Sequence, residues 1–322
     1  MTIRLVFMGS PEFAVPSLRR LVGAGYDIAA VYTQPDRMAG RGRRLRPSPV
    51  KQAAEQLDLP VIQPPSLRSQ GAIEELAALQ PEAIVVVAFG QILRPAVLQI
   101  PPHGTLNVHA SLLPRYRGAA PVASAILDGQ ETTGVTIMLL DECLDTGPML
   151  AQRAELIRPE DTTATLTERL ADLGADLLLV TLSAWLAGEI QPQAQNDATA
   201  TLTHRIRKED GAIDWQLPAV EIWRHIRAYT PWPGATTTLN GVPLQILQAW
   251  PAPAEPGGPP GTVRTLAGRV DIPSALPRPA FAVQTGDGAL LPLVLQKAGR
   301  KALSAREFLN GERGLLGSRL GA

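Results

Sequence analysis

The chain has 322 residues, of which 45% are hydrophobic and 19% charged, so its composition excludes a disordered protein and fits a globular one of about two domains. No run of about 18 apolar residues is present, which excludes a membrane-spanning helix. We expect no signal peptide, and the single cysteine Cys143 cannot form an internal disulfide. We therefore expect a cytoplasmic protein. The 30 basic residues balance the 30 acidic ones, but residues 190–322 carry 14 basic against 10 acidic residues, so the neutral total does not exclude an anionic partner.

The first part of the chain alternates short apolar runs with helical stretches. The apolar runs predict strands over residues 3–8, 28–32, 61–62, 84–88, 105–108 and 135–139. Helices are expected over 13–21, near 48–57, 70–79 and 119–128, and over 162–187. This alternation is typical of an α/β fold with a Rossmann-like, doubly wound, mostly parallel sheet that helices cover on both faces. We therefore expect a first domain over residues 1–189.

The pattern changes after residue 189. The next stretch is polar and lacks periodicity, so we expect a linker over 190–206. A helix is predicted over 219–229, and short apolar runs separated by Gly and Pro follow at 235–239, 242–250, 261–266, 280–285 and 289–296. Such a series predicts a smaller, OB-like β-barrel domain, here over residues 207–322.

The strongest chemical signal lies at the end of the strand predicted at 105–108. Asn107 and His109 are two residues apart, so the period of a strand places both side chains on one face, at the edge of an open α/β sheet where ligands bind. An amide donor beside an imidazole can hold a carbonyl oxygen and move a proton. Asp145 follows the strand at 135–139, and we expect it at the same edge, where it could orient His109. Alternatively, these side chains only satisfy loop backbone.

A second signal is a basic loop. Residues 37–51 hold six basic side chains and no acidic one, and Arg on a long loop suits a nucleic-acid backbone. A small basic barrel is also a frequent nucleic-acid platform, although a solvated charge run is the alternative. The expected contacts are Arg37, Arg41, Arg43, Arg44, Arg205, Arg207, Lys208, Lys297 and Lys301. The four histidines and single cysteine show no metal-ligand spacing, so we expect no metal.

Several stretches resemble the methionyl-tRNA formyltransferases, which are folate-dependent formyltransferases. The resemblance is carried by residues 33–37, 39–42, 107–121, 134–138 and 144–147, and extends through 213–215, 231–233 and 301–305. It implies that Asn107, His109 and Asp145 catalyse formyl transfer from 10-formyltetrahydrofolate to the α-amine of methionine on initiator tRNA, and that the basic residues above bind that tRNA. It further implies contacts to the folate from Phe89, Gly90, Ser111, Leu112, Leu113, Pro114, Leu140 and Asp141.

Two other functions stay open at this point. A formyltransferase that acts on a sugar nucleotide or another small amine would keep Asn107, His109 and Asp145 but would not need the basic loop. A nucleic-acid-binding protein without catalytic activity would use the basic barrel and would bind no folate. We expect a monomer, because the sequence shows no heptad and no repeated apolar face.

Overall fold

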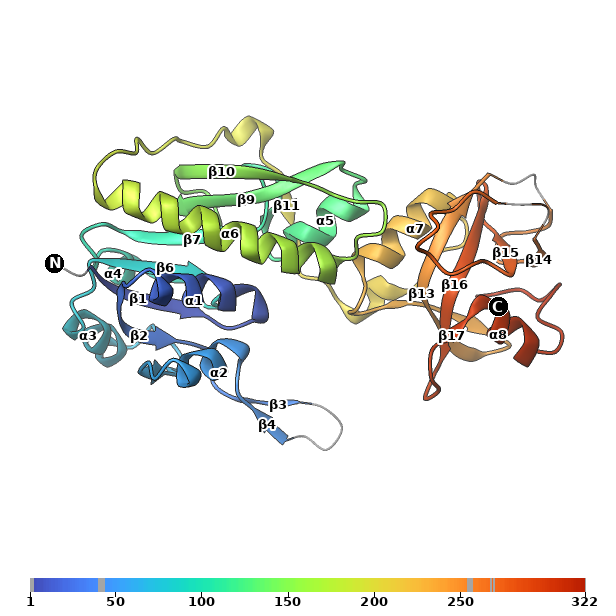
Figure 1. Cartoon of the computed structure of the whole chain (residues 1–322), viewed down its shortest axis with the longest axis horizontal. Helices are drawn as coiled ribbons and strands as arrows, with labels where there is room; N and C mark the ends of the chain where they lie inside the picture. Colours follow the sequence, from blue (N-terminus) through green and yellow to red (C-terminus); the bar gives the residue numbers. More distant parts are fainter. Residues whose placement is uncertain (1–2, 40–43, 254–256, 267, 269, 322) are drawn as a thin grey trace. The chain divides into compact units, whose positions relative to one another are not determined.

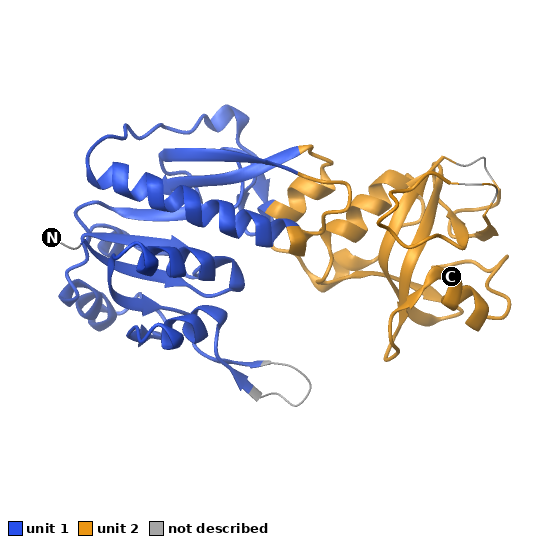
Figure 2. Cartoon of the chain, viewed as in Figure 1, with its two compact units in different colours: residues 1–121, 132–156, 166–204 blue, residues 122–131, 157–165, 205–322 orange. Residues whose placement is uncertain are grey.

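The computed structural model describes residues 3–39, 44–253, 257–266, 268 and 270–321, so the predicted contacts Arg41 and Arg43 lie outside the described residues. The chain divides into two compact units (Figure 2). Unit 1 comprises residues 1–121, 132–156 and 166–204, and unit 2 comprises residues 122–131, 157–165 and 205–322. The expected domain limits at 189 and 207 stay a prediction.

Unit 1 is built on a seven-stranded sheet (Figure 1). From one edge to the other, its strands are β10 (Met149–Leu156), β9 (Thr132–Leu139), β7 (Thr105–His109), β6 (Ala83–Val87), β1 (Arg4–Gly9), β2 (Asp27–Tyr32) and β5 (Val61–Ile62). The five strands from β7 to β5 run parallel, whereas β9 is antiparallel to β7 and to β10. Strand β6 is fully buried and is an apolar run, whereas β7 is equally buried but carries the polar residues Thr105, Asn107 and His109. The prediction of a mostly parallel sheet is confirmed.

Helices cover both faces of this sheet. They are α1 (Val15–Gly23), which follows the 3-10 turn η1 (Glu12–Ala14), α2 (Pro49–Gln56), α3 (Gln70–Ala78), α4 (Pro95–Leu98) and α6 (Thr163–Leu186). Leu76 of α3 and Val97 of α4 pack with Val86 of β6 in one buried cluster. On the other face, Gly174 of α6 lies so close to Val108 that an added Cβ would come within 2.9 Å of that side chain.

This layering determines which face of the sheet the polar side chains at the end of β7 point to. Since Val108 faces α6, its neighbours in the strand, Asn107 and His109, point to the opposite face. Asn107 pairs in register with Val86, which places it on the α3 and α4 side of the sheet. The period-two argument for Asn107 and His109 therefore agrees with the packing.

Unit 2 is a curled antiparallel sheet with helices against it. Its elements are α5 (Pro121–Leu127, from residue 122 on), η3 (Lys208–Gly211), α7 (Ala219–Ala228), β12 (Ala235–Leu239), β13 (Val242–Ala252), β14 (Val263–Thr265), β15 (Phe281–Gln284), β16 (Ala289–Lys297), β17 (Leu303–Ser304) and α8 (Ala305–Gly311). The strand order is β12-β13-β16-β15-β14, with β17 beside β16. The five strands expected from the sequence are present.

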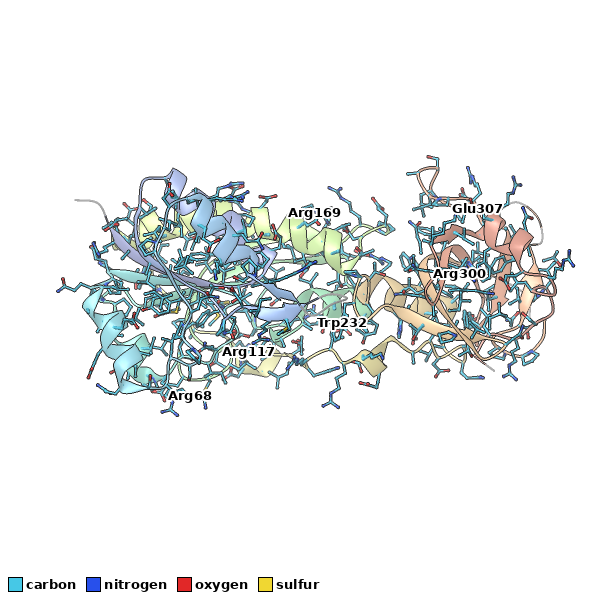
Figure 3. The ribbon with its side chains drawn as sticks, turned by 90° about the horizontal axis from the view of Figure 1, so that it is seen from below. Arg68, Arg117, Arg169, Trp232, Arg300 and Glu307 are labelled. Atoms are coloured by element: carbon cyan, nitrogen blue, oxygen red, sulfur yellow. The ribbon has the colours of Figure 1, made fainter. Side chains whose placement is uncertain are left out.

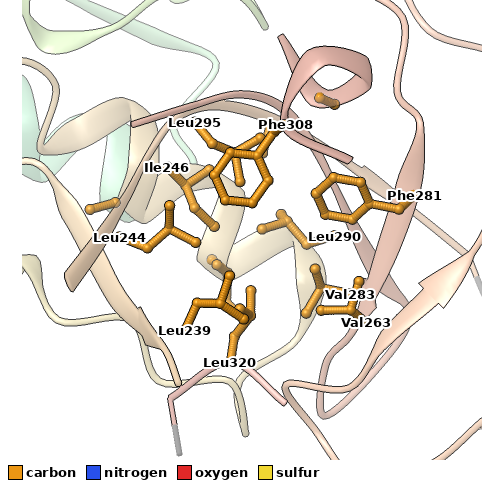
Figure 4. Close-up of a cluster of buried hydrophobic side chains, with 14 of the residues drawn as sticks. Leu239, Leu244, Ile246, Val263, Phe281, Val283, Leu290, Leu295, Phe308 and Leu320 are labelled. Carbon is orange, nitrogen blue, oxygen red and sulfur yellow. The ribbon is translucent and has the colours of Figure 1, made fainter. Parts of the chain in front are cut away.

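The C-terminal segment closes this sheet into a barrel-like shape. Gly317 donates its N–H to the carbonyl of Val263 in β14, and Gly321 donates to the carbonyl of Thr238 in β12, so one segment covers both open edges. Large apolar side chains such as Phe281 and Phe308 fill the interior (Figure 4). No helix within the described ranges is long and apolar enough to cross a membrane.

Candidate active site

Two polar side chains end the buried strand β7. Asn107 and His109 are only 7% and 6% exposed, although burying a polar group without a partner is costly. The side-chain amide of Asn107 makes no hydrogen bond to any of the residues that the structure describes, and it faces the same side of the sheet as His109. An unpaired amide held in a buried position is therefore free to donate to a bound carbonyl oxygen.

The carboxylate of Asp145 completes the site. Its Oδ2 lies 3.6 Å from Nδ1 of His109, and the two side chains are 12% and 7% exposed. The same oxygen accepts a hydrogen bond of 2.8 Å from the N–H of Gly118. Asp145 has a φ of 54°, in the left-handed region that Asp tolerates better than most residues. The structure thus brings together the three residues that the sequence singled out.

The expected reason for this convergence was wrong. Strand β9 is antiparallel to β7, and Leu139 at its end pairs with Leu106, whereas His109 pairs with Thr136. The loop after β9 therefore starts at the opposite end of β7. Asp145 reaches His109 because residues 140–148 fold back toward the end of β7 before β10 begins at Met149.

The two ring nitrogens of His109 have different partners. Nε2 lies 3.0 Å from the carbonyl oxygen of Tyr116, and a carbonyl only accepts, so Nε2 carries a proton. Nδ1 faces the carboxylate of Asp145. Nδ1 is therefore the ring nitrogen at which a proton can be exchanged. Because the Nε2–H is already bonded, Asn107 is the donor that this arrangement leaves for a substrate oxygen.

The turn after β7 is held by its own hydrogen bonds. Ser111 donates to the carbonyl of Arg115 and accepts at its own carbonyl from Thr136 Oγ1. Leu113 donates its N–H to the same Thr136 oxygen and accepts from Gln152. Of the predicted folate contacts in this turn, Ser111 and Leu113 are therefore buried and satisfied internally, whereas Leu112 and Pro114 are partly exposed.

The other predicted folate contacts lie on two loops. The Phe89 side chain is part of the core of unit 1, and its carbonyl accepts from Ser10 and Gln34. Its neighbour Gly90, in contrast, is exposed to solvent. Leu140 packs partly against the same core. The exposed Asp141 carboxylate accepts from the N–H of Cys143 and from Thr146, so it stabilises the turn that precedes Asp145. A role of these residues in folate binding stays a prediction.

The basic residues differ in whether an acidic side chain pairs with them. Arg37 and Arg44 begin the strands β3 (Arg37–Ala39) and β4 (Arg44–Arg46), which form a hairpin where the sequence suggested only a loop. In unit 2, Arg205, Arg207, Lys208 and Lys301 are exposed. Lys297, in contrast, pairs with Glu312, so its charge is largely neutralised and it fits nucleic-acid contact less well than the others.

Sequence reasoning missed the segment that supports the site. Gln195 donates to the carbonyls of Asp145 and Gly147, each at 2.8 Å, and accepts from the buried Arg117 at 3.0 Å. Strand β11 (Leu202–Thr203) pairs with β8 (Arg117–Gly118). The stretch is polar and without periodicity, because hydrogen bonds rather than apolar contacts hold it, so no pattern in the sequence indicates its position. No group of three or more His, Cys, Asp or Glu side chains within the described ranges could hold a metal ion.

Solved structures of other proteins share this architecture. The N-formyltransferase from Helicobacter canadensis, in complex with folinic acid and dTDP-3-aminofucose, is 20% identical with a TM-score of 0.65, covering 92% of this chain and 100% of that chain. HypX from Aquifex aeolicus, in complex with tetrahydrofolic acid, is 19% identical with a TM-score of 0.63, covering 96% of this chain and 47% of that chain. These similarities establish the fold.

Comparison of the sequences establishes the family. The formyl transferase model matches residues 3–182, and the model of the formyl transferase C-terminal domain matches residues 205–313. The methionyl-tRNA formyltransferase of Chloroflexus aurantiacus is 51% identical over 96% of this chain and 97% of the relative. That of Roseiflexus sp. is 50% identical over 100% of this chain and 96% of the relative. The chain therefore belongs to the formyl transferase family and, within it, to the methionyl-tRNA formyltransferases.

Proposed function

We propose that this enzyme transfers the formyl group of 10-formyltetrahydrofolate to the α-amine of methionine esterified to initiator tRNA, a step of translation initiation. The observation that carries the proposal is the convergence of Asn107, His109 and Asp145, with 3.6 Å between His109 Nδ1 and Asp145 Oδ2. The names of the relatives that match over nearly the whole chain support the same acceptor.

The residues at the site suit each part of this reaction. The amine nitrogen forms a bond to the formyl carbon, and the formyl oxygen gains negative charge, which the amide of Asn107 stabilises as a donor. The bond between that carbon and N10 of the folate then breaks. The amine loses a proton and the folate nitrogen gains one, and His109 with Asp145 moves this proton at the Nδ1 side of the ring.

Exposed basic residues support tRNA as the carrier of the acceptor amine. Arg205, Arg207 and Lys208 lie within four consecutive positions at the start of the C-terminal part of unit 2, all of them exposed. Guanidinium and ammonium groups bind phosphates by charge, and this binding weakens as salt rises. We infer that these residues, with the hairpin β3–β4 and the segment between its strands, contact the tRNA backbone.

A competition between acceptors tests the proposal. Radiolabelled 10-formyltetrahydrofolate is offered with methionyl initiator tRNA in one reaction and with an amino sugar nucleotide in a second, and binding of a folate analogue is measured by calorimetry. Formylation of the tRNA together with folate binding is the expected result. Formylation of the sugar nucleotide alone would assign the chain to small amines, and no folate binding would reject formyl transfer altogether.

Two further expectations belong to this proposal. We infer that the enzyme acts in the cytoplasm, where initiator tRNA is used, and as a monomer. Sedimentation at micromolar concentration is expected to give the mass of one 34.4 kDa chain, and a stable dimer would contradict the second expectation.

A further inference from the structure

We propose that Gln195 is a positioning residue for formyl transfer, which acts by holding the main chain of Asp145 so that the carboxylate faces His109. The inference rests on the proposed function, because it assigns Gln195 a task only if Asp145 takes part in catalysis. Among the described residues, Gln195 makes no hydrogen bond to the side chain of Asn107, His109 or Asp145, and it is separated from Asp145 by 50 positions in the sequence.

The amide of Gln195 joins the two ends of one tight turn. Its Nε2 donates to the carbonyl of Asp145 and to that of Gly147, both at 2.8 Å. A backbone in the left-handed region costs about 1–2 kcal/mol for a residue other than Gly, and Asp145 has a φ of 54°. The two hydrogen bonds on either side of Thr146 oppose relaxation of this conformation, which would turn the carboxylate away from His109.

The orientation of the amide is itself fixed. The guanidinium of Arg117 donates from Nε to Oε1 of Gln195 at 3.0 Å and from Nη2 to Asp197 at 2.7 Å. Arg117 has no acceptor atom in its side chain, so only the oxygen of the amide can face it, and the NH2 group must face the two carbonyls. The Arg117 side chain is only 7% exposed and is labelled in Figure 3, and charge-assisted hydrogen bonds of this kind are stronger than neutral ones.

The same segment also holds the other side of the site. We call residues 195–203 the strap. Thr201 accepts from the N–H of Tyr116 and from that of Arg117, through its hydroxyl and its carbonyl, at 2.8 and 2.9 Å. Tyr116 presents its carbonyl to His109 Nε2, and Gly118 donates to Asp145 Oδ2. The strap therefore fixes the turn that contacts both His109 and Asp145, and Gln195 is the one of its side chains that bonds the Asp145 loop directly.

The chain contains a matched control for the chemistry of this amide. Gln284 in unit 2 donates from Nε2 to the carbonyls of Thr285 and Gly288, both at 3.1 Å, and accepts from Arg264 Nη1 at 2.6 Å. It has the same three kinds of hydrogen bond in a turn that contains none of the proposed catalytic residues. Substitution of Gln284 therefore measures the structural cost of losing such an amide.

The experiment compares Gln195→Met with Gln284→Met in the full chain, because Met keeps the length of the side chain without its donors. Steady-state formylation of methionyl-tRNA is expected to show kcat lowered about 10–100-fold in Gln195→Met, with the KM for tRNA unchanged. Gln284→Met is expected to keep the native kcat, whatever melting temperature it loses. A native kcat in Gln195→Met, or an equal loss in both variants, would overturn the proposal.

A double-mutant cycle separates positioning from a general effect on the fold. If Gln195 acts through the Asp145 carboxylate, Gln195→Met is expected to lower kcat no further once Asp145→Asn is present. Full additivity of the two losses would overturn the proposal. If Gln195→Met does not fold, Gln195→Glu takes its place, since its carboxylate still accepts from Arg117 and faces the two carbonyls without a donor.

The outcome for Asp145→Asn alone separates this inference from the proposed function. A native kcat in Asp145→Asn would contradict the role of Asp145 and thus the proposed mechanism. A strongly reduced kcat in Asp145→Asn beside a native kcat in Gln195→Met would leave the mechanism intact and reject only the role of Gln195.

Discussion

The Nδ1 atom of His109 lies 3.6 Å from the Oδ2 atom of Asp145, with both side chains nearly excluded from water. The strength of this contact depends on small shifts of either residue, because electrostatic interactions change steeply with distance in a site of low dielectric. The surrounding turns, which hold Tyr116, Gly118 and Asp145 in left-handed backbone conformations, therefore determine whether the site is assembled.

Gly118→Ala is expected to disassemble this site. Gly118 has a φ of 110°, and an added Cβ would lie 2.6 Å from the carbonyl oxygen of Thr203. We expect the free energy of unfolding to fall by about 2–4 kcal/mol and formylation to fall with it, because the N–H of Gly118 that holds Asp145 must move. Urea unfolding and initial rates of formylation measure the two effects.

The control for this change is Gly25→Ala. Gly25 has a φ of 82°, and apart from its chain neighbours no described residue has an atom within 4 Å of an added Cβ, so only backbone strain of about 1–2 kcal/mol is expected, with native activity. Native activity and stability in Gly118→Ala would show that the turn is not constrained in the way the structure indicates.

His225 in α7 is expected to make the protein less stable in acid. Burial lowers the pKa of His225, against the opposing charge of Asp210, and its Nε2 is buried without a hydrogen-bond partner among the described residues. In the folded state the ring thus takes up its proton at lower pH than in the unfolded state, where the pKa is about 6.5. Stability is therefore lost as the pH falls from about 6.5 toward the lowered pKa, by up to about 1.4 kcal/mol per pH unit.

Unfolding by urea at several pH values between 5 and 7.5 checks this expectation. His225→Phe is expected to reduce the slope of stability against pH in this window, since the variant has no proton to take up there. The exposed His204 provides the control, and His204→Gln is expected to keep the native slope. An unchanged slope in His225→Phe would mean that His225 does not titrate differently in the two states.

Arg41→Leu is expected to weaken tRNA binding without affecting the folate. Each phosphate contact contributes to the salt dependence of binding, so losing one reduces the slope of log affinity against log salt by about 1. The KM for methionyl-tRNA should rise, while the Kd of a folate analogue stays native. Arg68→Leu, at an exposed arginine outside the predicted contact set, is the matched control, and an unchanged KM in Arg41→Leu would reject a role of residues 37–51 in tRNA binding.

Buried elements of the fold are those that the sequence predicts best. Strand β6 is covered on both faces, so its sequence is purely apolar, and the five longest runs beyond residue 230 correspond to β12–β16. Strand β10 was missed because it is an edge strand whose residues are exposed or partly exposed. Helix α8 carries a capping box between Ser304 and Glu307, a signal that the sequence does contain and that was not used.

The sequence singled out the three residues that meet in the candidate site, but not the geometry by which they meet. Asn107 and His109 follow from the two-residue period of a strand, which is a local property. The position of Asp145 depends on the direction of β9 and on the path of residues 140–148, which no local pattern specifies. Arg117 and Gln195 could not be found at all, because side chains that bond to distant carbonyls leave no periodicity in the sequence.

The central claim is that Asn107, His109 and Asp145 together transfer the formyl group, and single-turnover formylation by His109→Ala tests it most directly. With enzyme in excess over methionyl initiator tRNA and saturating 10-formyltetrahydrofolate, the account predicts a rate at least about 100-fold below native and a native Kd for a folate analogue. A rate within about threefold of native, which corresponds to less than about 1 kcal/mol of barrier, would contradict it.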